Sequence, residues 1–242
     1  MSALLSLRNV SKRYGALTVT DDISFSVRAG ETLGILGPNG AGKTTLFNLI
    51  SGDTRADSGT VEFDGYAIGA MAPYRRCVAG IGRSYQVPRP FGNMTVFENL
   101  LVAATYGAGL SEAEAAPLCV EVLDNTGLRS KANRTAGALT LLDRKRLELA
   151  RALATRPKLL LLDEIAGGLT EAETHQLVAE IDRVKQQGVT IVWIEHVVHA
   201  LLALADRLLV INFGKHLAEG VPDQVMNDPE VRRVYLGLEA HA

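Results

Sequence analysis

One glycine-rich segment has the residue types and the spacing that bind polyphosphate. The run Gly37-Pro38-Asn39-Gly40-Ala41-Gly42-Lys43-Thr44 fits the pattern G-x-x-x-x-G-K-[ST]. Glycine lets successive backbone N–H groups turn toward phosphate oxygens. In this pattern Lys43 gives a full positive charge to the β- and γ-phosphates, and the Thr44 hydroxyl is an oxygen ligand for Mg²⁺. The run also lies between an apolar stretch and a stretch of helical spacing, which favours a phosphate loop over a glycine-rich turn without a ligand.

Two acidic residues follow a short apolar run in the second half of the chain. Asp163 and Glu164 come directly after Leu159–Leu162, which has the length and composition of a buried parallel strand. Ligands of open α/β sheets bind at the carboxyl ends of the strands. We therefore expect Asp163 to hold Mg²⁺ and Glu164 to orient and deprotonate the attacking water. By itself, the same sequence is also compatible with a solvated acidic turn.

Apolar segments alternate along the chain with segments of helical periodicity. Strand-like segments are Leu4–Val10, Ile23–Val27, Glu31–Leu36, Val61–Phe63, Ile81–Tyr85, Leu159–Leu162, Val189–Ile194 and Leu208–Asn212. Helix-like segments are Lys43–Ser51, Thr95–Thr105, Ser111–Leu128, Leu142–Thr155, Thr170–Gln187, Val197–Ala205, Pro222–Asn227 and Pro229–Leu236. This alternation predicts an α/β fold with a mostly parallel sheet. The N-terminal third is richer in strands and turns, and residues 90–150 predict an inserted helical lobe.

Composition excludes several classes of protein. The chain has 242 residues, a formal net charge of −2 and hydrophobic residues at 47%, which are globular values. Proteins that coat nucleic acid are usually basic, so we expect no nucleic-acid partner. The two cysteines, Cys77 and Cys119, are far apart and indicate a reducing compartment without a zinc module. No apolar run approaches the roughly 20 residues needed to span a bilayer, and the N-terminus lacks the pattern of a signal peptide.

With these motifs in this order, the sequence resembles the ATP-binding subunits of ABC transporters over nearly its whole length. The resemblance identifies Gly37–Thr45, including Thr45, as Walker A and implies ATP and Mg²⁺ as ligands. It identifies Asp163 as the Walker B acid that holds the metal and Glu164 as the catalytic glutamate. Gly167-Gly168-Leu169-Thr170 occupies the position of the D-loop.

The resemblance also gives roles to three residues that carry little signal alone. Tyr14 matches the aromatic residue that stacks on adenine, Gln86 the Q-loop glutamine that contacts Mg²⁺ and water, and His196 the switch histidine at the γ-phosphate. Taken singly, each is also compatible with a structural role: a core or surface aromatic, a polar loop residue and a strand-end histidine.

The signature motif of the family, close to Leu-Ser-Gly-Gly-Gln, is altered in this chain. The aligned residues are Leu139, Thr140, Leu141, Leu142 and Asp143. Thr140 keeps a hydroxyl for the ATP of an opposite subunit. Leu142 replaces a glycine, and we expect its side chain to crowd that phosphate and to resist a positive φ. This predicts a heterodimer with one weak ATP site.

Finer features are similar to the branched-chain amino-acid uptake group: Arg83-Ser84-Tyr85-Gln86, Leu147–Ala152 and the tail from Ala218 to Gly237. They imply an importer subunit for branched-chain amino acids or related small amides. Its expected partners are a second ATPase subunit, two transmembrane permeases and, indirectly, a secreted substrate-binding protein. The resemblance places the subunit on the cytoplasmic side of the membrane.

The resemblance implies a P-loop ATPase fold with a mostly parallel core sheet, an N-terminal antiparallel β lobe and an inserted helical lobe. It implies a single domain over 1–242 with three parts. Residues 1–87 and 152–214 give the β lobe and nucleotide-binding core, 88–151 the helical lobe and 215–242 a C-terminal extension. Alternatives are a urea or amide importer, a lipopolysaccharide-export ATPase, a soluble ABC ATPase without a transport role, and a subunit that binds nucleotide without hydrolysing it.

Overall fold

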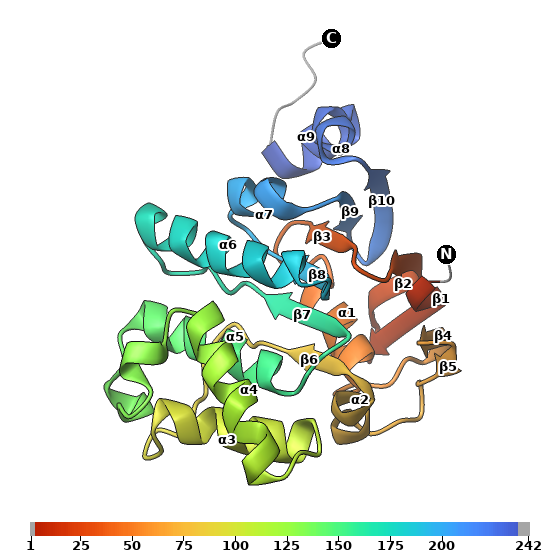
Figure 1. Ribbon diagram of the computed structural model, residues 1–242. Coiled ribbons are helices and arrows are strands. Elements are labelled where there is room, and N and C mark those ends of the chain that lie inside the picture. Colours follow the sequence, from red (N-terminus) through yellow and green to blue (C-terminus); the bar gives the residue numbers. More distant parts are fainter. Residues whose placement is uncertain (1–2, 237–242) are drawn as a thin grey trace. The chain divides into compact units, whose positions relative to one another are not determined.

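The computed structural model describes residues 3–236 (Figure 1). It divides into two compact units. The first unit holds the described residues up to Pro73 and those from Val192 onward, and the second holds Tyr74–Ile191. Within residues 3–236, no helix has both the length and the apolar character needed to cross a membrane. The separate helical lobe expected over residues 88–151 stays a prediction.

An antiparallel sheet begins the first unit, with the strand order β2-β1-β4-β5. Its strands are β1 (Ala3–Tyr14), β2 (Leu17–Arg28), β4 (Ser58–Phe63) and β5 (Tyr66–Ala67). Leu5 of β1 pairs with Val27 on one side and with Phe63 on the other, and all three side chains are buried. The alternation of apolar residues in β1 thus sets the register of the sheet. The expected antiparallel N-terminal lobe is confirmed.

Parallel strands and short helices complete the first unit. The strand β3 (Thr32–Leu36) pairs in parallel with β9 (Arg207–Asn212), and β10 (Lys215–Gly220) adds an antiparallel edge to β9. All five residues of β3 are buried. The helices of this unit are α1 (Lys43–Ser51), α7 (Val198–Leu204), α8 (Pro222–Asn227) and α9 (Pro229–Leu236).

The second unit contains a parallel strand pair and the longest helices among the described residues. The strand β6 (Ile81–Arg83) pairs with β7 (Leu159–Asp163), and β8 (Thr190–Ile194) runs from this unit into the first. The helices are α2 (Pro73–Ala79), α3 (Val96–Gly107), α4 (Glu112–Asn125), α5 (Leu141–Ala154) and α6 (Glu171–Gln186), with short 3₁₀ turns at Arg129–Lys131 and Ala136–Ala138. The helices α4 and α5 both pack against α3.

Helix ends follow the capping signals in the sequence. The sequence places Glu114 three residues after Ser111 and Glu173 three residues after Thr170, which is the capping-box pattern, and both capping boxes are formed. The expected helix to Leu128 ends earlier, at Asn125, because Gly127 has a φ of 68° that a helix does not accommodate. Three elements were not predicted: β5, β10 and α2.

Candidate nucleotide-binding site

The predicted phosphate loop lies between β3 and α1 in the first unit. Gly42 has a φ of 100°, and a Cβ there would lie 2.4 Å from the carbonyl oxygen of Val19, so only glycine fits. Lys43 is buried, and its Nζ donates to the carbonyl oxygens of Gly37 at 2.6 Å and of Pro38 at 3.0 Å. Its ammonium group thus lies inside the loop. Thr44, by contrast, is exposed in the first turn of α1.

Tyr14 is the last residue of β1 and lies at the tip of the β1–β2 hairpin. Its side chain is 50% exposed, which excludes a core role. Lys12 Nζ lies 5.4 Å from the centroid of the ring, and the Tyr14 hydroxyl is 3.4 Å from Thr54 Oγ1. These contacts hold the ring in place, and its exposed surface is available to a stacking partner.

His196 follows the carboxyl end of β8, also in the first unit, and its side chain is exposed. The turn is held by Glu195, a buried residue whose Oε2 accepts from the backbone N–H of His196 at 3.0 Å and of Val197 at 3.4 Å. Glu195 was missed by sequence reasoning. Its signal is an acid placed directly at the end of a fully apolar strand.

In the second unit, Glu164 and Gln86 are brought together. Gln86 Nε2 donates to Glu164 Oε2 at 2.5 Å. Glu164 has a φ of 46°, an uncommon conformation for a glutamate, and such conformations cluster at functional sites. Next to it, Asp163 ends β7, and its Oδ2 accepts from Arg83 Nη2 at 3.0 Å with both side chains nearly buried.

Two titratable residues of α5 anchor the segment that carries Gln86. Lys145 is 3% exposed, and its Nζ donates to the carbonyl oxygens of Gln86 at 2.6 Å and of Glu164 at 3.3 Å. Glu148 is buried one turn further along α5. Burial raises its pKa, while the ion pair with Arg151 and the backbone N–H groups of Arg89 and Tyr85 act in the opposite direction. Sequence reasoning missed both residues, because charged residues on a helix usually face solvent.

The altered signature begins α5. Thr140 is the N-cap of the helix, and its Oγ1 accepts from the backbone N–H of Asp143 at 3.3 Å. Asp143 is 2% exposed. Burial alone would raise the pKa of Asp143, but hydrogen bonds from Lys131 at 2.5 Å and from Thr140 at 2.9 Å hold that pKa below its usual range.

The expectation about Leu142 is wrong in two respects. Leu141 and Leu142 both lie in α5, and neither has a positive φ, so the backbone needs no glycine here. The side chain of Leu142 is only 8% exposed, whereas that of Leu141 is 46% exposed. A helix turns 100° per residue, so the residue that presents its side chain outward is Leu141. In the predicted D-loop, a Cβ on Gly168 would lie 3.4 Å from Leu141 Cδ2.

A family model for ABC transporters matches residues 20–167, which is more than half of the chain. The chain belongs to the ABC transporter family. A second model, for branched-chain amino acid ATP-binding cassette transporters, matches residues 215–241. The family resemblance read from the sequence is thereby confirmed for this ABC cassette.

Curated relatives and solved structures match over nearly the full length. A branched-chain amino acid transport ATP-binding protein, BraF of Pseudomonas aeruginosa, is 36% identical, with 97% of this chain and 98% of the relative covered. The lipopolysaccharide export ATP-binding protein LptB of Haemophilus influenzae is 34% identical with the same coverage. A nucleotide-free ATP-binding cassette and the ADP conformation of an ATP-binding cassette, each from an ABC transporter, are each 32% identical. Their TM-scores are 0.88 and 0.89, and each comparison covers 98% of this chain and 100% of the other. The fold class and the ATPase class predicted from the sequence are confirmed.

The predicted site residues of this ABC cassette form two groups, one in each unit. In the first unit, residues 37–45 follow β3, Tyr14 is the last residue of β1, and His196 lies two residues after the end of β8. In the second, Gln86 follows β6, Asp163 ends β7, and Glu164 comes directly after Asp163. In the second unit, Gln86 and Glu164 are hydrogen-bonded to each other, and Lys145 donates to the backbone carbonyl oxygens of both. The individual roles of all these residues stay predictions.

Proposed function

We propose that this chain is the ATP-hydrolysing subunit of an ABC importer for branched-chain amino acids or related small amides. The observation that carries this proposal is the match of residues 215–241 to the branched-chain group, a segment that lies outside the general ABC match. Relatives named for branched-chain amino acid transport, such as BraF, support it over the full length. The subunit would be peripheral, on the cytoplasmic side of the membrane.

ATP would be bound by the phosphate loop and by Tyr14. The backbone N–H groups of residues 37–45 and the ammonium of Lys43 meet the phosphates, and Tyr14 stacks on adenine. Mg²⁺ would be held by Thr44, Gln86 and Asp163. These residues offer hydroxyl, amide and carboxylate oxygens, the donors that Mg²⁺ prefers beside substrate phosphates. When bound, the ion neutralises phosphate charge.

Hydrolysis needs positioning and charge stabilisation more than covalent chemistry. Glu164 would orient the attacking water and accept its proton. Gln86, at 2.5 Å from Glu164, would hold that carboxylate in place, and the exposed His196 would contact the γ-phosphate. Lys145 donates to the backbone carbonyl oxygens of both Gln86 and Glu164. The side chains of Gln86 and Glu164 would therefore move together.

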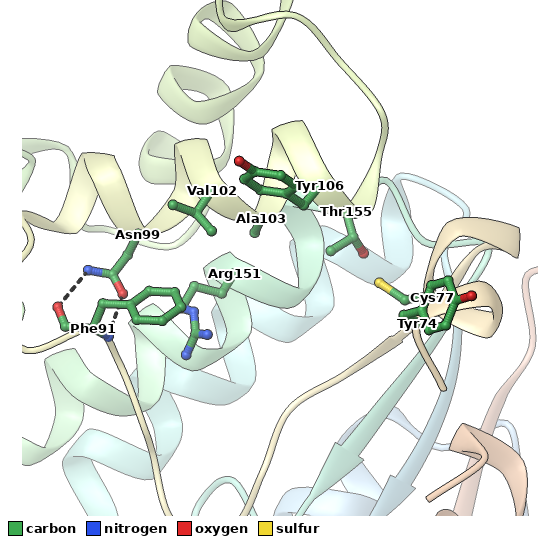
Figure 2. A pocket seen from close by; sticks show the side chains of 10 residues that line it. Tyr74, Cys77, Phe91, Asn99, Val102, Ala103, Tyr106, Arg151 and Thr155 are labelled. Carbon is green, nitrogen blue, oxygen red and sulfur yellow. Dashed lines mark hydrogen bonds between the residues drawn. The ribbon is translucent and has the colours of Figure 1, made fainter. Parts of the chain in front are cut away.

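The permease would dock on a groove of the second unit. This cavity of about 240 Å³ is lined by Tyr74, Phe91, Tyr106, Arg151 and others (Figure 2). Asn99 fixes Phe91 by accepting from its N–H at 2.9 Å and donating to its carbonyl oxygen at 3.2 Å. Arg151 lies over the Phe91 ring, 5.2 Å from its centroid. An apolar floor with one cation suits a short amphipathic helix, and Phe91 of the groove lies five residues after Gln86.

The partner cassette would be a different protein, because Leu141 projects from the signature. In a head-to-tail dimer this leucine would meet the partner's nucleotide and weaken that site, while this chain's own Glu164 faces a normal signature. Leu141→Gly should therefore raise turnover at the partner's site. Leu142→Gly should instead lower the melting temperature, because it opens a cavity in the packed side of α5. Equal effects of both substitutions on turnover would contradict the assignment of Leu141.

Transport by the assembled complex tests the function. The chain would be purified with its permeases, reconstituted into proteoliposomes and supplied with ATP and with the binding protein. We expect ATP-dependent uptake of radiolabelled leucine, isoleucine or valine, and none from a matched complex that carries Glu164→Gln. ATP hydrolysis without uptake of any aliphatic amino acid or small amide would contradict the proposal. ATP-dependent release of lipopolysaccharide from the membrane would support the alternative that the 34% identity to LptB favours.

A further inference from the structure

The turn between β9 and β10 has an unusual residue at a demanding position. Asn212 pairs with Lys215, so Phe213 and Gly214 form a two-residue hairpin loop. Both have positive φ, 46° and 74°, the pattern of a type I′ turn, which prefers Asn-Gly or Asp-Gly. The β4–β5 hairpin of the same unit obeys this preference, with Asp64 and Gly65 at φ of 50° and 80°. Phenylalanine is unfavourable in the left-handed region.

Packing does not account for Phe213. Its side chain is 83% exposed, more than any other large apolar side chain among residues 3–234. The exposed ring of Phe213 contributes nothing to the core, and a phenylalanine at this position destabilises the type I′ turn. Observed outliers of this kind are grounds for a functional hypothesis.

The turn is fastened to the phosphate loop. The N–H of Gly214 donates to the carbonyl oxygen of Ala41 at 3.0 Å, and its carbonyl oxygen accepts from the N–H of Asp21 at 2.8 Å. A Cβ on Gly214 and a Cβ on Gly42 would each come within 2.4 Å of the same atom, the carbonyl oxygen of Val19. Phe213 is therefore an immediate neighbour of the loop, at the carboxyl edge shared by β3 and β9, where ligands of α/β sheets bind.

The chemistry of phenylalanine selects the part of the nucleotide that it can contact. A phenyl ring has no donor and no charge for phosphate, whereas the purine face and the C–H face of ribose are apolar. We infer that Phe213 packs against the adenosine part of the nucleotide whose phosphates occupy residues 37–45, as a second contact besides Tyr14. The inference rests on the proposed ATP-binding role of this loop.

The test replaces Phe213 with the residue that the turn prefers. Phe213→Asn should leave the melting temperature unchanged or raise it, while the Kd for ATP rises about three- to tenfold, the scale of one partial stacking contact. Competition by inorganic tripolyphosphate should be unchanged. Phe213→Tyr should keep the ATP Kd of wild type. Asp64→Asn in the β4–β5 turn is the matched control and should leave the ATP Kd unchanged.

Each other outcome overturns the inference. An unchanged ATP Kd in Phe213→Asn means that the ring does not touch the nucleotide. An equal loss for ATP and tripolyphosphate means that the turn only shapes the phosphate loop. Failure of the inference is distinguishable from failure of the proposed function, because wild type and Lys43→Ala are titrated in parallel. If wild type binds ATP and Lys43→Ala does not, the loop stands whatever Phe213 does.

Discussion

Substituting Lys145 with methionine removes one buried ammonium that joins two functional segments. Lys145 Nζ donates to the carbonyl oxygens of Gln86 at 2.6 Å and of Glu164 at 3.3 Å. Methionine is similar in length and has no donor, so Lys145→Met keeps the volume filled while both carbonyl groups lose a charge-assisted hydrogen bond. The side chain of Lys145 is 3% exposed, so water does not readily replace it.

The expected effect on stability follows from the shorter bond. A hydrogen bond to a charged group contributes about 1.5–3 kcal/mol, and the contact at 3.3 Å adds little. At about 2–4 °C per kcal/mol for a chain of this size, we expect the melting temperature to fall by about 3–12 °C.

The effect on turnover should be larger than the effect on binding. Gln86 and Glu164 meet at 2.5 Å, and a misplacement of about 1 Å in a reacting group can lower a rate on the order of 100-fold. We therefore expect kcat to fall about 10- to 100-fold. The Kd for ATP should stay within about a factor of two, because Lys43 and Tyr14 belong to the other unit.

Phosphate release and equilibrium titration with ATP, on the same preparations, separate these effects. The matched control is Lys158→Met. Lys158 is exposed and directly precedes β7, at the end of that strand away from Asp163. A kcat within twofold of wild type, in a variant whose melting temperature has fallen, would refute the positioning role of Lys145. A loss of ATP affinity as large as the loss of kcat would refute it as well.

Three further predictions concern single side chains. Glu164→Gln should lower kcat at least about 100-fold, the scale of a lost general base, and leave ATP binding intact; a rate within a factor of two of wild type would remove Glu164 from the mechanism. Tyr14→Ala should raise the ATP Kd about 5- to 30-fold through a lost stacking contact; calorimetry showing no more change than in the exposed control Tyr66→Ala would return Tyr14 to a surface role. The pKa of Asp143 is lowered from its ordinary value of 3.8, so its ionised carboxylate stabilises the folded state at pH values above 3.8. This contribution is lost as the pH falls through the folded-state pKa. The difference in unfolding free energy between wild type and Asp143→Asn should therefore be steady from neutral pH down to about pH 4 and then narrow; a difference that widens on acidification would contradict the ion pair.

The sequence contained enough information for most elements because their signals are local. The fully apolar runs Leu159–Leu162 and Val189–Ile194 can only be buried strands, and Ser111 and Thr170 carry their capping partners three residues on. The strand β10 was missed because an edge strand, paired on one side, needs no apolar pattern; no residue of Lys215–Gly220 is buried.

Parts of the site depend on contacts between residues far apart in the chain. Lys145 and Glu148 look like the solvated face of a helix, and only their contacts with residues 85–89 and with Glu164 reveal their burial. The orientation of the altered signature was also beyond the sequence. Once Thr140 caps α5, the helical rotation buries Leu142 and exposes Leu141, the reverse of what alignment to the motif suggested.

Titration of the purified chain with ATP, beside Lys43→Ala, tests the central claim that residues 37–45 bind the nucleotide of an ABC ATPase. The account predicts one saturable site per chain in wild type. It also predicts a Kd at least about tenfold higher in Lys43→Ala, because one charge-assisted contact to phosphate is lost. Binding of ATP by Lys43→Ala as tightly as by wild type would contradict the account.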